Sequence, residues 1–285
     1  MMNGSIRLAL AALAAVLLPI GPAMASNAWD NASEAAYADG WAAGDNGGSG
    51  FLPWIFAYSG IEPANHSDHF IDSAPLAANS LGAPAFAMTD SGRAFFFDTA
   101  QAIRPFPSPL AIGQTLGVDV DGASFANGDP NGFSQGNVVA LRNNVLDGPE
   151  SGKERFSLFT NNQFNNDNWS VTNPAGSGSS LDTGISAGSS FHVSFTLTGA
   201  ETYSLDITPI GGGASLFSQN GTLRVPTAGT LIDRFRFADY GTGSSADGSS
   251  EMFFNNLSLV PEPTSLVLMA LASLALCGAV RRGRN

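Results

Sequence analysis

Apolar and polar residues alternate along the middle of the chain with the period of a β-strand. The clearest stretch runs from Phe191 to Thr198, where Phe, Val, Phe and Leu take every second position. Successive side chains of a strand point to opposite faces, so this stretch predicts a strand with one buried side and one solvent-facing side. Residues 202–208 repeat the alternation after a Gly-Ala-Glu turn, and the two segments together predict an antiparallel hairpin.

Further short runs rich in Phe, Val, Leu, Ile and Thr lie between turns made of Gly, Ser, Asn and Asp. They predict strands over residues 94–98, 115–120, 138–142, 155–160, 231–238 and 252–259. Only residues 31–43 offer a helical pattern, with Asn31 as N-cap and Glu34 completing a capping box. Many short strands favour an all-β fold of two antiparallel sheets packed face to face, a β-sandwich of the jelly-roll type.

The C-terminal residues differ in character from the rest of the chain. Pro261-Glu262-Pro263 precedes an uncharged run from Thr264 to Val280, and three arginines follow that run. At about 1.5 Å per residue, the run makes a helix of roughly 25 Å, which crosses the core of a bilayer. Arginines behind a transmembrane helix favour the cytoplasm, so the chain before Pro261 is predicted to lie on the far side of the inner membrane.

This order of a Pro-Glu-Pro motif, an apolar helix and a basic tail resembles the PEP-CTERM sorting domain of exported proteins in biofilm-forming Gram-negative bacteria. The resemblance implies that a membrane-embedded exosortase recognises and cuts the segment. Its motif residues would be Pro261, Glu262 and Pro263, and its basic tail would include Arg281 and Arg282. The alternative is an ordinary single-pass anchor that follows a proline-rich linker.

The N-terminal residues carry the features of a secretory signal peptide. Arg7 supplies a basic region, residues 8–20 an apolar stretch, and Ala23 and Ala25 the small residues of a signal peptidase site. The predicted parts of the chain are a signal peptide over residues 1–25, one β-sandwich body over 26–259 and a sorting segment over 260–285. We expect the body to be exported across the inner membrane, anchored there before processing, and extracellular or on the cell surface afterwards.

The body carries a second resemblance. Residues 136–143 and 155–159, and later 233–240 and 253–259, look like bodies often attached to such sorting signals. Those bodies resemble concanavalin A-like or laminin G-like jelly rolls, in which a terminal strand near the sorting signal pairs back into the sheet. The resemblance thus implies the same fold class as the strand pattern.

Charge limits the partners of the body. The whole chain has 12 basic and 24 acidic residues, a net charge of −12. Without Arg7, Glu262 and the three terminal arginines, residues 26–260 keep 8 basic and 23 acidic residues, a net charge of −15. Such a surface repels nucleic acid and anionic lipid, which argues against DNA binding. The single cysteine, Cys277, lies in the apolar run, so we expect the body to fold without disulfides.

Catalytic patterns are sparse. The sequence has neither the Glu-x-Asp-x-x-Glu strand of jelly-roll glycosidases nor a Gly-x-Ser-x-Gly elbow, and we interpret Glu154 as a solubilising charge. His66 and His69 would suit zinc only on a helix, and Pro63 favours a surface loop instead. His192 is expected to point away from the core. We therefore expect no enzyme and no required cofactor.

Calcium is the cation that best suits this acidic chain. Asp119, Asp121 and Asp129 lie among asparagines and glycines, and Ca²⁺ prefers six to eight hard oxygen ligands. The spacing departs from the EF-hand pattern. The alternative, which we favour, is a set of Asx turns in which short side chains bond their own backbone.

Sugar binding is a further interpretation, because an aromatic ring can stack on a sugar while Asn, Asp and Arg bind its hydroxyls. Trp29, Tyr37 and Tyr58 are candidates by residue type. We single out Trp41, Trp54 and Trp169, which lie beside Gly-rich or Asn-rich loops. Aromatic side chains are also good core material, so the alternative is that these rings are buried.

Three functions are compatible with these patterns. The favoured one is a non-enzymatic envelope or extracellular-matrix protein, processed by signal peptidase and exosortase and associated with exopolysaccharide or biofilm. The second is a carbohydrate-binding module of the same layer, and the third is a secreted glycan-active hydrolase.

Overall fold

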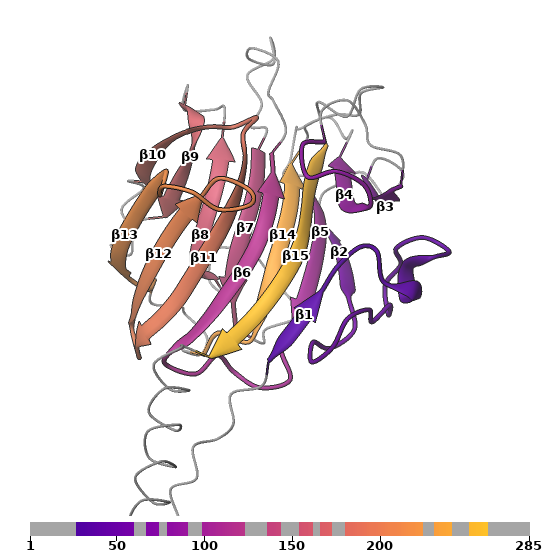
Figure 1. Cartoon of the computed structure of the whole chain (residues 1–285), viewed down its shortest axis with the longest axis horizontal. Coiled ribbons are helices and arrows are strands. Elements are labelled where there is room, and N and C mark those ends of the chain that lie inside the picture. The colour runs from indigo at the N-terminus through magenta and orange to yellow at the C-terminus, as the bar shows by residue number, and fades with distance from the viewer. Residues whose placement is uncertain are drawn as a thin grey trace, which may run out of the picture.

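A computed structural model describes residues 27–59, 67–73, 79–90, 99–122, 136–143, 154–161, 166–172, 180–224, 231–240 and 251–261. These residues form two antiparallel β-sheets packed face to face (Figure 1). Their one helical element is the 3-10 turn η1 (Ala35–Tyr37). The predicted all-β antiparallel sandwich is therefore confirmed. No helix within these ranges has the length and apolar character needed to cross a membrane.

The first sheet has eight strands and contains both the start and the end of the described chain. Its path runs through β13 (Phe217–Thr222), β12 (Thr202–Thr208), β11 (Ser190–Gly199), β6 (Gln114–Asp121), β15 (Met252–Pro261), β4 (Ala85–Asp90) and β3 (Ser67–Asp72), and β1 (Ala28–Asp30) pairs with β15. Strands β11 and β12 pair antiparallel, which confirms the predicted hairpin. The terminal strand β15 lies inside the sheet, between β6 and β4.

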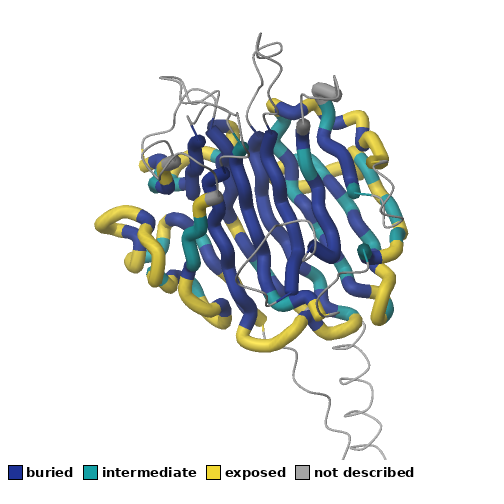
Figure 2. Tube along the Cα trace, turned by 180° about the vertical axis from the view of Figure 1, so that it is seen from behind, coloured by how far each residue is buried: buried dark blue, intermediate teal, exposed yellow. Residues whose placement is uncertain are grey.

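The second sheet has seven strands. Its path runs through β10 (Ser180–Ser186), β9 (Asn166–Thr172), β8 (Glu154–Asn161), β7 (Gly136–Arg142), β14 (Arg234–Tyr240), β5 (Thr99–Pro105) and β2 (Ile55–Ser59). The central strands β7, β14 and β5 are buried along almost their whole length (Figure 2). The centre of the seven-stranded sheet is therefore covered on both faces, whereas most residues of the edge strand β10 are exposed.

Aromatic rings from both sheets fill the space between them. Phe237 of β14 stacks on Phe254 of β15 with ring centroids 3.9 Å apart and an interplanar angle of 5°. Phe86 of β4 lies 5.5 Å from Phe254 in a second stacked contact. Burying one such ring contributes on the order of 2 to 3 kcal/mol. Core burial of this kind can stabilise a body whose sequence contains no cysteine before Cys277.

The strand predictions are confirmed for four further segments, and the helix prediction is wrong. Strands β6, β7, β8 and β15 cover the predicted ranges, β14 begins at Arg234, and residues 94–98 lie outside the described part. The predicted helix over 31–43 contains only the η1 turn. The Asn31 side chain accepts a hydrogen bond from Ser33 N (2.9 Å), and Glu34 makes no side-chain cap. Contacts of this segment with both sheets override its local helical pattern.

The start and the end of the described chain lie side by side. Ala28 is opposite Leu259 in the antiparallel pair of β1 and β15. The last strand continues to Pro261, which is opposite Gln114 at the start of β6. Six other residues of the predicted processing signals lie outside the described residues, and their roles stay predictions. They are Glu262, Pro263, Arg281 and Arg282 of the sorting segment and Ala23 and Ala25 of the signal peptide.

Candidate functional site

The three tryptophans singled out for sugar stacking lie in the core. Trp41, Trp54 and Trp169 are each at most 4% exposed. The Trp41 ring has the rings of Trp54, Phe56 and Phe86 within 5.0 Å, centroid to centroid. The Trp169 Nε1–H donates to Ala187 O at 3.1 Å. The prediction that these rings stack on sugars is wrong, because they fill the space between the two sheets.

Trp29 is the tryptophan that reaches the surface, with 47% of the residue exposed. Its neighbours Ala28 and Asp30 are buried, so the ring of Trp29 points to the outer face of the eight-stranded sheet. The backbone is held on both sides. Trp29 is opposite Ser258 in β15, and it exchanges two hydrogen bonds with Ser49, of 2.8 and 2.9 Å. A strand of three residues is too short to show an alternation in the sequence, so the pattern missed it.

Gly48 allows the close approach that holds Trp29. Its φ is +65°, and a Cβ added there would lie 2.0 Å from the carbonyl oxygen of Trp29. Gly44 also has a positive φ of +97°, but an added Cβ would meet nothing within 4 Å. Both glycines therefore need a positive φ, but only at Gly48 would a side chain also clash with neighbouring atoms.

Gly48→Ala should destabilise the body more than Gly44→Ala. Both variants force an alanine into a left-handed conformation, which costs about 1 to 2 kcal/mol. The Gly48 variant adds a clash with the Trp29 backbone, which we expect to cost about 1 kcal/mol more. Urea unfolding of the two variants measures this difference. Equal losses would show that Gly48 does not hold Trp29.

A chain of polar side chains lies on the same outer face. The Asp119 Oδ1 atom is 2.6 Å from His192 Nδ1, and Asp119 Oδ2 accepts from Asn256 Nδ2 at 2.7 Å. Asn256 Oδ1 in turn accepts from Asn31 Nδ2. An ionised carboxylate only accepts hydrogen bonds, so His192 Nδ1 carries a proton, and in the neutral imidazole Nε2 is left as an acceptor. The prediction that His192 points away from the core is confirmed by the burial pattern of β11.

The absence of a side chain at Gly117 leaves room for the His192 imidazole and the Ser258 hydroxyl. A Cβ at Gly117 would be 2.5 Å from Ser258 Oγ and 3.4 Å from His192 Nε2. Asn256 adopts a φ of 53° in an irregular stretch of β15 between Asn255 and Ser258. This irregular backbone turns the Asn256 amide towards Asp119. Trp29, Ser258, His192 and Asn256 therefore share one surface, which we call the Trp29 face.

Two segments cover the sheet beside the Trp29 face. Asn255 Oδ1 accepts from Ala32 N at 2.9 Å, and Asn255 Nδ2 donates to Pro84 O at 2.8 Å. Asp121 Oδ2 accepts from Ser80 N at 2.6 Å, and burial raises the pKa of this carboxyl to about 6. The residues from 31 to 33 and from 79 to 84 therefore border the Trp29 face on one side.

The geometry of Asp119 and Asp121 differs from the predicted turns. Both residues lie in strand β6, so the Asx-turn interpretation is wrong for them. Their carboxylates already accept hydrogen bonds from protein donors. In the described part of the chain, no group of three His, Cys, Asp or Glu side chains is placed to hold a metal ion. Asp129, the third calcium candidate, lies outside the described residues.

His69 belongs to the core, which corrects the surface-loop prediction. It lies in β3 and stacks on Phe56, with centroids 3.9 Å apart and an angle of 11°. Its Nε2–H donates to Gln101 O at 3.1 Å, and its Nδ1 accepts from Tyr58 OH at 3.2 Å. Burial lowers the pKa of His69 to about 4. His66 lies outside the described residues.

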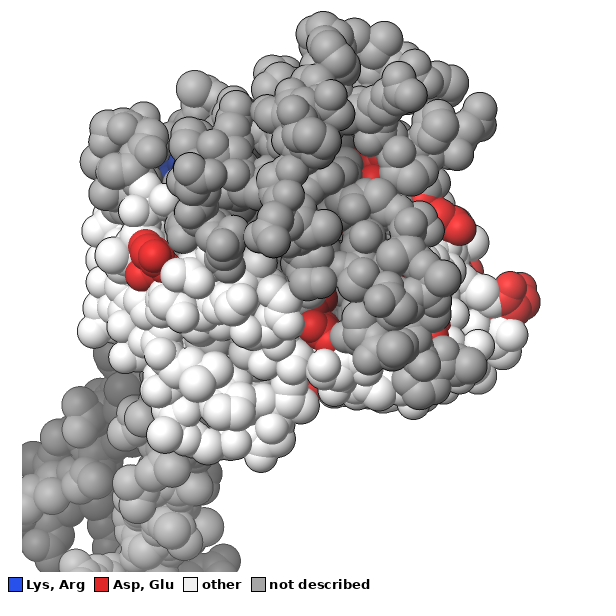
Figure 3. Space-filling view, turned by 90° about the horizontal axis from the view of Figure 1, so that it is seen from above, with Lys and Arg blue, Asp and Glu red and all other residues white. Residues whose placement is uncertain are grey.

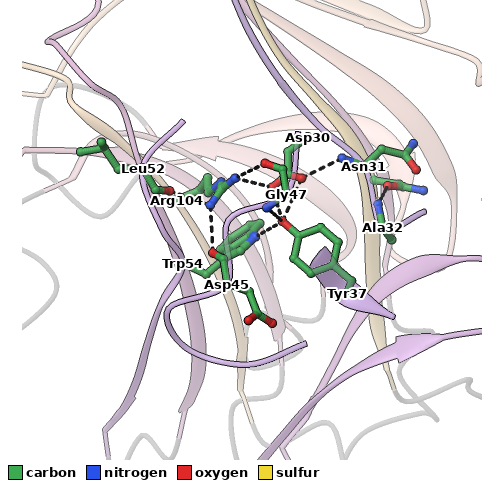
Figure 4. Close-up of polar contacts among 10 residues, drawn as sticks. Asp30, Asn31, Ala32, Tyr37, Asp45, Gly47, Leu52, Trp54 and Arg104 are labelled. Atoms are coloured by element: carbon green, nitrogen blue, oxygen red, sulfur yellow. Dashed lines mark hydrogen bonds and ion pairs between the residues drawn. The ribbon is translucent and has the colours of Figure 1, made fainter. Parts of the chain in front are cut away.

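A buried network fixes the strand that presents Trp29 (Figure 4). Arg104 Nη2 lies 2.8 Å from Asp30 Oδ2, and neither side chain is exposed. The Tyr37 hydroxyl donates to Asp30 at 2.7 Å and accepts from Trp54 Nε1 at 3.0 Å. Arg104 also donates to Leu52 O at 2.6 Å and to Gly47 O at 2.9 Å. Asp30 lies between Trp29 and Asn31 in sequence, so the network holds both outward-facing neighbours in place.

A second polar cluster lies on the outer face of the seven-stranded sheet. The fully buried Arg236 donates to Gln101 Oε1, Glu154 Oε1 and Tyr240 OH, each at 2.9 Å. Glu154 is therefore an ion-pair partner inside the fold, and its interpretation as a solubilising charge is wrong. Because Arg236 is buried and its polar partners lie within the protein, we place the candidate binding site on the Trp29 face.

The described surface is acidic where it can be seen from above. Figure 3 shows Asp and Glu side chains scattered over that side, with hardly any Lys or Arg among the described atoms. This distribution agrees with the excess of acidic over basic residues in the sequence. It favours uncharged or cationic ligands over polyanions.

No protein-family model matches the sequence, and no curated protein sequence matches it either. Several solved structures are similar in shape at low identity. Lectin II from Ulex europaeus is 9% identical, covers 79% of this chain and 96% of its own, and has a TM-score of 0.41. Lectin UEA-II complexed with galactose is 9% identical, with coverages of 73% and 92% and a TM-score of 0.40. The Ca²⁺-bound exoplasmic/lumenal domain of VIP36 is 10% identical, with coverages of 73% and 83% and a TM-score of 0.38. With TM-scores below 0.5, these likenesses support no functional argument.

Proposed function

We propose that the body is a carbohydrate-binding domain of an extracellular layer and that the Trp29 face holds the sugar. One observation carries this proposal. Of the four tryptophans in the chain, only Trp29 is exposed, and its ring shares a surface with the ordered polar groups of Ser258, His192 and Asn256. An exposed indole beside fixed donors and acceptors suits a ligand that is apolar on one side and hydroxylated on its edge.

The polar groups of the Trp29 face can satisfy sugar hydroxyls. In the neutral imidazole, His192 Nε2 accepts a hydrogen bond, while the Ser258 hydroxyl both donates and accepts. Hydroxyl side chains continue along the same face, where Thr115 Oγ1 and Thr196 Oγ1 are 2.7 Å apart. This open row favours an extended polysaccharide chain. Because the body is acidic, we propose a neutral polysaccharide.

Binding without hydrolysis is the activity that this geometry supports best. Ser258, His192 and Asp119 are of the types found in hydrolytic triads, but among the described residues no hydrogen bond joins Ser258 to His192. Ser258 also lies within the paired strand β15, so its backbone does not form the exposed turn that builds an oxyanion hole. We therefore propose a binding domain, and a glycan hydrolase has no comparable support.

Export and processing belong to the same proposal. The small residues Ala23 and Ala25 support cleavage by signal peptidase, and the Pro261-Glu262-Pro263 motif supports cutting by an exosortase. A concanavalin A-like ancestry of the sandwich is proposed on the sequence resemblance alone. The body would then act at the cell surface or in the surrounding polymer as a non-enzymatic component.

Trp29→Ala should weaken binding to a neutral polysaccharide at least about fivefold, since a stacked ring contributes on the order of 1 kcal/mol or more. Affinity electrophoresis against soluble β-glucan, galactomannan and dextran measures the loss. Tyr58→Ala is the matched control, because Tyr58 is also 47% exposed but lies on edge strand β2 of the other sheet. The control should bind as the wild type does.

Tryptophan fluorescence gives an independent reading, because the other three tryptophans are buried. Ligand should shift the emission of the wild type to shorter wavelength and leave that of Trp29→Phe unchanged. Wild-type protein that binds none of the polysaccharides would contradict the proposal and favour a matrix protein without sugar recognition. Equal loss in the Trp29 and Tyr58 variants would contradict the assigned site.

A further inference from the structure

Four exposed aliphatic residues lie at the end of the sandwich where β15 ends and β6 begins, the lower end in Figure 1. We call this end the exit rim. Its side chains are between 42 and 63% exposed and belong to Leu52, Ile112, Leu231 and Val260. They come from four separate segments of the chain, so their presence at one end is a property of the fold.

Backbone hydrogen bonds join these segments into one end of the molecule. Leu52 N donates to Pro105 O at 3.0 Å, at the end of β5. In the connection that follows, Leu110 N donates to Ile232 O at 2.7 Å and Gly113 N to Leu197 O at 2.8 Å. Val260 is opposite Thr115 at the start of β6. The exit rim is therefore a continuous structure that links the two sheets.

The exit rim presents little net charge, in contrast to the acidic body. The connection over residues 106–113 contains no charged residue. Asp233 forms an ion pair with Arg234 at 2.8 Å, and Glu201 forms one with Arg155 at 2.6 Å. Exposed aliphatic side chains that cluster on a soluble protein mark an interaction surface.

The chain leaves the body through the exit rim. Pro261 is opposite Gln114 there, and the uncharged run over residues 264–280 begins three residues later. Three residues span at most about 11 Å. If the run crosses a bilayer, the exit rim is held within that distance of the lipid surface. The exposed aliphatic side chains of the exit rim would then lie close to the lipid surface.

We propose that the exit rim docks on the surface of the bilayer that holds residues 264–280. Leu52, Ile112, Leu231 and Val260 would insert into the headgroup region, as the apolar residues of interfacial proteins do. Neutral lipid is the expected partner, because the acidic body repels an anionic surface. Docking would keep Pro261-Glu262-Pro263 at the membrane surface, within reach of a membrane-embedded protease. This inference does not rest on sugar binding.

The test uses the full chain in nanodiscs of phosphatidylcholine. Cys277→Ser removes the native thiol, and Ile112→Cys then carries a polarity-sensitive dye. The matched control places the same dye at Leu216→Cys, which is also exposed but lies between β12 and β13 at the opposite end. Spin-labelled lipid should quench the dye at position 112 at least threefold more than the dye at position 216. The emission at position 112 should also shift to shorter wavelength when detergent is replaced by lipid.

Three results would overturn the proposal. Equal quenching at positions 112 and 216 would show that the exit rim does not face lipid. A full chain that does not enter nanodiscs would remove the membrane-held tail on which the docking depends. A shift at position 112 that grows with protein concentration in detergent, without quenching by lipid, would assign the rim to a second copy of the chain. None of these results affects polysaccharide binding by the Trp29 face, so the two proposals fail separately.

Discussion

Arg104→Met should lower the free energy of unfolding by about 3 to 5 kcal/mol at neutral pH, because it leaves a buried carboxylate without its cation. Asp30 and Arg104 are both fully buried, and 2.8 Å separates their charged atoms. Arg104 also binds the backbone carbonyls of Leu52 and Gly47, which lose a donor in the variant. Urea unfolding of the wild type and the variant measures the loss.

Arg224→Met is the matched control. Its side chain is 24% exposed and lies 3.5 Å from Glu154, so its removal should cost about 0 to 1 kcal/mol. The double variant Asp30→Asn, Arg104→Met removes the stranded charge and should recover part of the loss. A loss below about 1 kcal/mol for Arg104→Met would contradict the view that this ion pair stabilises the contact between β1 and β5.

The variants His69→Gln and Asp121→Asn should change the pH dependence of stability in opposite directions. Burial lowers the pKa of His69 from 6.5 to about 4, so its contribution is present above pH 6.5 and is lost as the pH falls through 4. Burial raises the pKa of Asp121 from 3.8 to about 6, so its contribution is present below pH 3.8 and is lost as the pH rises through 6. At about 1.4 kcal/mol per pKa unit, the pH-dependent contribution of each residue to the free energy of unfolding is roughly 3 kcal/mol. The two contributions have opposite pH dependence and nearly cancel in the wild type.

As the pH falls from 7 to 4, the free energy of unfolding of His69→Gln should therefore rise by about 3 kcal/mol relative to that of the wild type. That of Asp121→Asn should fall by about 2 to 3 kcal/mol relative to the wild type. Both replacements remove a titration and keep hydrogen-bonding groups for Gln101 O and Ser80 N. Urea unfolding at pH 7, 5.5 and 4 measures the two differences. Variants that stay parallel to the wild type over this range would show that neither group titrates with a shifted pKa.

Alternation in the sequence predicted β11 and β12, which are buried on one side only. Strands β11 and β12 alternate apolar and polar residues because their outer face meets solvent. Strand β5 was not predicted. It is buried on both faces, but Gln101 and Arg104 interrupt its apolar residues, so its sequence shows no continuous apolar run. Periodicity in a sequence indicates which side of a strand contacts water. A polar residue that is buried with a hydrogen-bond partner looks exposed in such a pattern.

The candidate site was harder to predict than the fold. Residue type alone did not distinguish the buried Trp41, Trp54 and Trp169 from the exposed Trp29. Asp119 and His192 are 73 positions apart, and only the pairing of β6 with β11 brings them together. Likewise, Asp30 of β1 and Arg104 of β5 lie in different sheets, and they meet because the two sheets pack face to face.

The sequence by itself determined that this body is an acidic, cysteine-free, antiparallel β-sandwich, because composition and alternation are local properties of the chain. Only the tertiary structure decided which tryptophan meets solvent, which charges are buried in pairs, and that four distant aliphatic residues lie where the chain leaves the body. The physical reason is that burial depends on strand register and sheet packing. These bring together residues that are far apart in the sequence, and no local pattern records those contacts.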